Sequence, residues 1–154
     1  MRSFKYPFCT ILIMPYKFLE GITTADVAFE ATGTLEEVFE NAAIAVAEVQ
    51  VEIKTVKTAE KSHIDLERDD LSELLHDFLE ELVFIKDTEQ LLFVKAKVKI
   101  TKKKTYKLEA DLIGDHIKQD EQTMGTDVKA VTMHKFELKE VKKGKWRAQV
   151  VLDI

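Results

Sequence analysis

The sequence predicts a single-domain α+β fold, a two-layer sandwich in which two main helices pack on one face of a largely antiparallel sheet. Two segments in the first part of the chain repeat apolar residues at helical spacing, and four later segments alternate apolar and polar residues as strands do. A chain of 154 residues can bury one sizeable core without disulfides or metals. The sequence contains no internal repeat and no linker that would divide it.

The first elements are a strand over residues 24–31 and a helix that begins after Thr34. Gly33 ends the strand. Thr34 and Glu37 have the spacing of a capping box, in which each side chain binds the backbone N–H of the other residue. The apolar residues that follow at helical intervals are Leu35, Val38, Phe39, Ala42, Val46 and Val49. This helix therefore has an apolar face to lay on a sheet.

A short strand is expected around Ile64 and Leu66, followed by a second helix that Asp69 or Asp70 caps. The apolar stripe of this helix consists of Leu71, Leu74, Leu75, Phe78, Leu79 and Leu82. Acidic residues occupy mainly the other side, which is typical of a helix with one face in water.

The later strands are expected over residues 91–101, 106–112, 127–138 and 146–154. Residues 114–126 between them are polar and form a loop. Lys142, Lys143 and Gly144 turn the third of these strands into the last one as a hairpin.

The composition is that of an ordinary folded protein, with 45% hydrophobic and 33% charged residues and a net charge of −5. Cys9 is the single cysteine, which excludes an internal disulfide and fits a reducing cytoplasm. The apolar run over residues 8–14 is far shorter than the roughly 20 residues of a membrane span. We expect a cytoplasmic protein without a membrane segment. Residues 1–14 are expected to be an N-terminal extension or an upstream start, and residues 15–154 the folded domain.

Sequence patterns typical of catalysis are missing, and we expect no catalytic residues. Neither a HExxH zinc motif, nor Gly-x-Ser-x-Gly, nor a glycine-rich phosphate loop occurs. His76 is expected at the boundary of the acidic helix. His134 shares a strand face with Phe136 and is expected to be half-buried and hydrogen-bonded.

The stretch from Lys95 to Lys107 holds seven lysines and no acidic residue. It could bind phosphates of RNA, or it could be a solvated strand face that resists edge pairing. Lys95, Lys97 and Lys99 alternate with apolar residues, and Tyr106 is the one aromatic residue available for base stacking. The pattern favours the solvated face.

The last strand ends with two carboxylates one residue apart, the side chain of Asp153 and the α-carboxylate of Ile154. On one rigid edge they would repel each other unless a cation lay between them, and hard cations such as Ca²⁺ bind oxygens of this kind. A terminus that frays into water is the alternative, and spacing alone favours fraying.

Several segments resemble the archease family, in the right order over about residues 16–154. They are Thr23-Thr-Ala-Asp-Val27, Thr34-Leu-Glu-Glu-Val-Phe-Glu-Asn-Ala-Ala43, Asp87-Thr-Glu-x-Leu-Leu-Phe93, Asp127-Val-Lys-Ala-Val-Thr132 with His134, and Val151-Leu-Asp-Ile154. The resemblance implies a small cytosolic, non-catalytic protein that activates the GTP-dependent tRNA-splicing ligase of the RtcB type. Proteins of this family help that ligase to load GMP onto its own histidine and to turn over repeatedly.

The resemblance also implies a divalent-metal pocket, described with calcium, and a ligase partner through which the protein could contact tRNA indirectly. Carried onto this sequence, the metal residues are Asp26, Asp153 and Ile154, the last through its α-carboxylate. Thr23 stands where the family has a histidine and Ile22 where it has an acid, while Glu20 is a candidate replacement ligand. The alternative function is that of a chaperone or RNA-binding accessory protein for tRNA-modifying enzymes.

Overall fold

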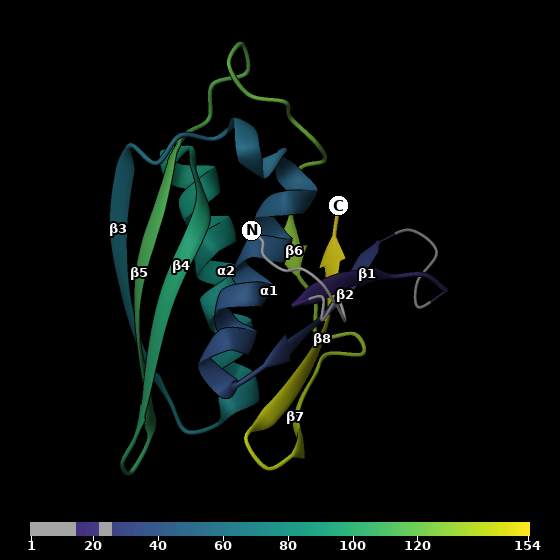
Figure 1. Ribbon diagram of the computed structural model, residues 1–154, viewed down its shortest axis with the longest axis vertical. Coiled ribbons are helices and arrows are strands. Elements are labelled where there is room, and N and C mark those ends of the chain that lie inside the picture. The colour runs from purple at the N-terminus through teal and green to yellow at the C-terminus, as the bar shows by residue number, and fades with distance from the viewer. Residues whose placement is uncertain (1–14, 22–25) are drawn as a thin grey trace, which may run out of the picture.

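The computed structural model describes residues 15–21 and 26–154, and in it two antiparallel sheets enclose two helices (Figure 1). One sheet contains β1 (Tyr16–Leu19), β2 (Val27–Gly33), β8 (Lys145–Asp153) and β6 (Ala130–Val131), with β7 (Glu137–Lys142) also paired to β8. The other sheet has the order β3 (Glu60–Arg68), β5 (Tyr106–His116), β4 (Leu91–Lys102). The helices are α1 (Leu35–Gln50) and α2 (Leu71–Glu89), and a short 3₁₀ helix covers Ile53–Thr55.

The α+β class, the two main helices and the antiparallel pairing of the strands are confirmed. The strands divide between two sheets, however, so the helices have a sheet on each side and form a middle layer (Figure 1). Helix α1 contacts β4 in one sheet and β2 and β8 in the other, and α2 also contacts both sheets. Alternation along a strand indicates which face is buried but not which strands pair, which is why it suggested one sheet and two layers.

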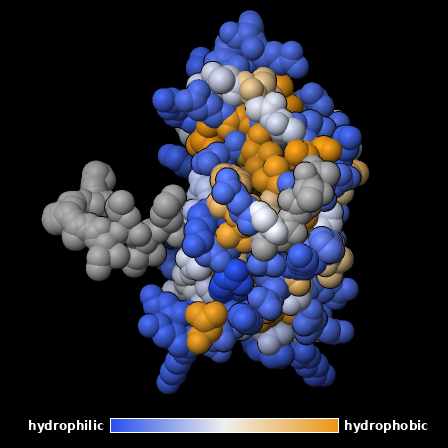
Figure 2. All heavy atoms as spheres, turned by 90° about the vertical axis from the view of Figure 1, so that its right-hand side faces the viewer, coloured by the Kyte–Doolittle hydropathy of each residue, from blue (hydrophilic) through white to orange (hydrophobic). Residues whose placement is uncertain are grey.

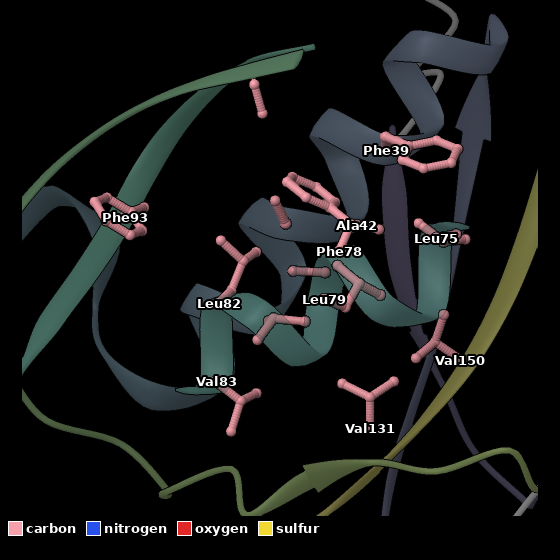
Figure 3. Packing of buried hydrophobic residues seen from close by; sticks show 14 of the residues in the cluster. Phe39, Ala42, Leu75, Phe78, Leu79, Leu82, Val83, Phe93, Val131 and Val150 are labelled. Carbon is pink, nitrogen blue, oxygen red and sulfur yellow. The ribbon is translucent and has the colours of Figure 1, made fainter. Parts of the chain in front are cut away.

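The core lies where the two helices meet the sheets (Figure 3). The rings of Phe39 on α1 and Phe78 on α2 pack at 6.1 Å between centroids, and both side chains are fully buried. Val131 of β6 and Val150 of β8 close this core from the side of the first sheet. The short strand β6 is thus tied to α2 by packing as well as to β8 by its backbone.

The beginnings of both helices agree with the sequence patterns. Thr34 Oγ1 accepts from the Glu37 N–H at 3.3 Å, and Glu37 Oε1 accepts from the Thr34 N–H at 2.9 Å, which completes the capping box. Asp70, rather than Asp69, caps α2 by accepting from the Glu73 N–H at 3.0 Å. Neither helix of the described chain combines the length and the apolar character needed to cross a bilayer.

The outer edge of β4 is covered by acidic side chains of α1. Glu40 accepts a hydrogen bond from the backbone N–H of Val98, and Glu36 accepts one from that of Ile100, each at 2.8 Å. An edge strand with unpaired N–H groups invites pairing with another chain. Here two carboxylates of a neighbouring helix take the place of a further strand.

The expected strand over residues 127–138 is wrong. The chain forms only the two residues of β6, then turns before β7 begins at Glu137. Lys135 has a φ of 53°, and the N–H of Phe136 donates to the carbonyl of Met133 at 3.2 Å, so the backbone bends where an extended strand was expected. His134 lies in this turn and is exposed, which corrects its prediction as a half-buried residue.

Candidate functional site

The end of β8 is held in the sheet and packed against the core. Strand β2 pairs with one side of β8 and β6 with the other, so that Leu152 lies between Val27 and Val131. The N–H of Lys129 donates to the carbonyl of Asp153 at 2.8 Å. The side chain of Ile154 is partly buried and packs against the core cluster. Fraying, which spacing alone favours, is therefore not what this strand does.

The antiparallel register of β2 and β8 places Asp26 and Asp153 at the same end of the sheet. Val27 pairs with Leu152, so the residue before Val27 lies next to the residue after Leu152 at the same edge. Directly opposed residues of two antiparallel strands have their Cα atoms about 4.5–5.5 Å apart and their side chains on one face. Both aspartates are half-buried. Two carboxylates from distant parts of the sequence thus share one end of the sheet, close to the α-carboxylate of Ile154.

Glu20 follows the end of β1 at this same edge, since Leu19 pairs with Ala28 of β2. Its side chain is exposed. Ile22 and Thr23, the two positions that differ from the archease pattern, lie outside the described residues. The assignment of Asp26, Asp153 and Ile154 as metal ligands stays a prediction. It is compatible with their positions, because all three lie at the same end of the sheet.

A second cluster of ionisable side chains lies on the outer face of the β3-β5-β4 sheet. His63 Nδ1 lies 2.8 Å from Asp111 Oδ1, and His63 Nε2 lies 3.0 Å from Asp65 Oδ1. These hydrogen bonds, first that of Asp111 and then that of Asp65, raise the pKa of His63. One ligand atom each from His63, Asp65 and Glu109 falls within 4.8 Å of the others. All are in contact with water, and carboxylates that flank an exposed histidine ring account for the arrangement.

The lysines of β4 lie beside this cluster. Lys97 pairs with Asp111 and Lys99 with Glu109 across the β4–β5 ladder. The β4 lysines are exposed, as a solvated face requires. A row of acids directly alongside weakens the positive potential that a phosphate-binding stripe needs.

Lys86 near the end of α2 is a buried cation that the sequence pattern did not reveal. Its side chain is 5% exposed, and its Nζ lies 2.5 Å from Asp127, 2.6 Å from Asp87 and 2.9 Å from the carbonyl oxygen of Val128. Burial lowers the pKa of Lys86, but its two aspartate partners outweigh this and raise it. A surface hollow of about 700 Å³ adjoins Lys86 and Gln50. The only sequence signal was a lysine that fell on the apolar side of the helix.

A small three-layer α+β protein with paired carboxylates at one sheet edge is the class that this fold and site define. Residues 16–154 match the model of the Archease protein family (MTH1598/TM1083). The protein archease of Methanothermobacter thermautotrophicus is 43% identical over 133 residues, and that of Pyrococcus abyssi is 40% identical over 133 residues. In both cases the match covers 85% of this chain and 94% of the relative. The chain belongs to the archease family.

Solved structures agree with this membership. The solution structure of Methanobacterium thermoautotrophicum protein 1598 superposes with a TM-score of 0.75 at 36% identity, covering 91% of this chain and 99% of that one. The crystal structure of a Thermotoga maritima protein, described as an archease and possible chaperone, has a TM-score of 0.56 at 18% identity. It covers 86% of this chain and 93% of that one, and it supports the fold alone.

Proposed function

We propose that this protein is a non-catalytic activator of the GTP-dependent tRNA-splicing RNA ligase of the RtcB type. It would promote guanylylation of the ligase and its multiple turnover, and it would act in the cytoplasm. Family membership supports the partner, and the carboxylate edge supports the mode of action. The single observation that carries the proposal is the register of β2 with β8, in which Val27, the residue after Asp26, pairs with Leu152, the residue before Asp153.

The residues at this edge fit a divalent cation, which we propose to be Ca²⁺. Asp26, Asp153 and the α-carboxylate of Ile154 are hard oxygen donors of the type that Ca²⁺ binds. Their negative charges repel one another when β2 and β8 pair, so a bound cation would stabilise the paired strand ends. When bound, such a cation supplies positive charge to phosphate oxygens. The role of the protein is to hold these oxygens in place. Ile154 is anchored because its side chain packs against the core.

The carboxylate edge would be presented to the nucleotide site of the ligase. The side of the molecule that carries the first sheet shows hydrophobic side chains gathered in its upper half, within a mostly hydrophilic surface (Figure 2). Apolar patches with polar rims are typical of protein interaction sites. A partner that covered this side would reach the same sheet that ends in Asp153.

A multiple-turnover ligation assay tests this function. Ligase with GTP and a broken tRNA would be followed with and without this protein, and again with a chelator. Asp26→Asn and Asp153→Asn should abolish most of the stimulation while the variants remain folded. Asp111→Asn is the matched control, because it removes an exposed carboxylate of the other sheet. Full stimulation by the Asp26 and Asp153 variants would rule out the carboxylate edge as the active feature.

A chaperone-like function is the second candidate, since the Thermotoga maritima protein of the same fold is described as a possible chaperone. A chaperone would suppress aggregation of unrelated or tRNA-modifying enzymes without GTP. An RNA-binding accessory protein would bind tRNA without ligase and with strong dependence on salt. The acidic residues paired with Lys97 and Lys99 disfavour RNA binding by these lysines.

A further inference from the structure

The end of β8 has an unusual neighbour on one side, a segment of residues 127–132 that is strand for two residues only. The N–H of Lys129 donates to the Asp153 carbonyl at 2.8 Å. Thr132 donates twice to the Val151 carbonyl, from its N–H and from its hydroxyl, each at 3.0 Å. This segment therefore holds the last residues of β8 on the side opposite to β2.

So short a stretch of strand is not stable by itself, and side chains of the helices hold it. Lys86 binds Asp127 and the carbonyl of Val128. Two acceptors on the helices take backbone N–H groups of the segment: Glu80 binds that of Val131 at 3.3 Å, and Gln50 binds that of Val128 at 3.4 Å. The segment is thus fastened to α1 and α2 on one side and to β8 on the other.

Among these anchors Lys86 makes the strongest contacts. Its buried ammonium group donates to two carboxylates and one carbonyl, all within 2.9 Å. Charge-assisted hydrogen bonds of this kind are roughly twice as strong as neutral ones. Moving the segment away would remove two of the three oxygens, those of Asp127 and Val128, and leave the buried ammonium group with Asp87 alone, which is unfavourable. Lys86 consequently fixes the start of the segment, and the ladder with β8 transmits this position to Asp153.

We propose that Lys86 is a positioning residue for the carboxylate edge: by fixing Asp127 and Val128 it sets the 127–132 segment along β8 and so places Asp153 opposite Asp26. This inference rests on the proposed metal-binding function of that edge. Lys86 touches none of the carboxylates at the edge itself. Its influence on the position of Asp153 passes through the hydrogen bond from the Lys129 N–H to the Asp153 carbonyl.

Lys86→Met is the test, because it keeps an unbranched side chain of similar length and removes the charge. Two quantities would be measured on the full chain, well below its melting temperature. The first is the affinity for Ca²⁺ by calorimetric titration with calcium chloride. The second is amide hydrogen exchange at Lys129 and Thr132 without metal. The control is Val98→Ala, which loosens the core at β4 in the other sheet.

Lys86→Met should weaken Ca²⁺ binding about tenfold, the size of effect known for residues that orient metal ligands. It should also speed exchange at Lys129 and Thr132. Val98→Ala should lower the melting temperature and leave the affinity and these two amides unchanged. Unaltered Ca²⁺ affinity and unaltered amide exchange in a folded Lys86→Met protein would overturn the proposal. An equal loss of Ca²⁺ affinity in Val98→Ala would also overturn it.

Two further measurements keep the outcome decisive. If Lys86→Met does not fold, Asp127→Asn replaces it, and a smaller loss of affinity in the same direction is expected because one anchor oxygen changes. If the parent protein binds no Ca²⁺, the proposed metal function fails, and exchange at Lys129 then decides the positioning role alone. Slow exchange that becomes fast in the Lys86 variant supports that role, and unchanged exchange refutes it.

Discussion

His63 is solvent-exposed on the outer face of β3, and each of its ring nitrogens lies within hydrogen-bond distance of a carboxylate. Lys86, by contrast, is almost fully enclosed and satisfied by three oxygens. In both residues, neighbouring aspartates favour the charged form and raise the pKa. The consequences differ, because water screens the exposed pair while the buried one cannot be separated without large cost.

The pKa of His63 should lie above its ordinary value of 6.5, because the hydrogen bonds to Asp111 and Asp65 favour the charged ring. A pKa raised in the folded state adds stability that is complete below the unfolded pKa. This stability is lost as the pH rises through the folded pKa. An NMR titration of the ring measures the value directly. Asp111→Asn should lower the pKa, and a His63 that titrates below 6.5 in the parent protein would contradict this interpretation.

Secondary structure elements show where sequence patterns were sufficient. The capping box at Thr34 and the cap at Asp70 are local, so the sequence alone predicted where α1 and α2 begin. The prediction of one strand over residues 127–138 failed because the alternation there resembles that of a single strand. In the structure, β6 and β7 pair with two separate stretches of β8. The sheet to which each strand belongs depends on contacts between distant residues, which periodicity does not contain.

Glu40→Ala should destabilise the protein by about 1 kcal/mol, because it leaves the partly buried N–H of Val98 without an acceptor. Urea unfolding gives the change in the free energy of unfolding. Glu40→Gln keeps an acceptor oxygen and should cost clearly less. Hydrogen exchange at Val98 should become faster in the alanine variant only. Equal losses in both variants would mean that the carboxylate does not protect this edge through its hydrogen bond.

Gly114→Ala should cost about 2–3 kcal/mol, the upper part of the range typical of overpacking. An added methyl group would overlap the carbonyl oxygen of Leu92, next to the bulge in β4 after Phe93. Gly144→Ala is the comparison: the turn there has open space around it and a φ of 76°, so only backbone strain of about 1 kcal/mol applies. Thermal unfolding of the two variants measures both. A smaller loss at Gly114 would contradict the close approach of β4 and β5.

At the scale of the whole molecule, the middle layer of helices connects the two sheets and also supports the carboxylate edge. The family resemblance grouped Asp26 with Asp153 and Ile154, whereas the sequence pattern alone singled out the last two and favoured a frayed end. The register of β2 with β8 places both aspartates at one end of the sheet. The support from Lys86 through residues 127–132 was not predictable. It depends on an ion pair between residues 41 positions apart and on a strand that the pattern misplaced.

Calorimetric titration with Ca²⁺ tests most directly whether this edge binds a cation. The parent protein should bind one Ca²⁺, while Asp26→Asn and Asp153→Asn should each weaken the binding by more than about tenfold, since each removes a charged oxygen ligand. Asp111→Asn on the opposite sheet should bind as the parent does. No heat of binding in the parent, or equal affinity in the Asp26 and Asp153 variants, would contradict the metal site at the meeting point of β2 and β8.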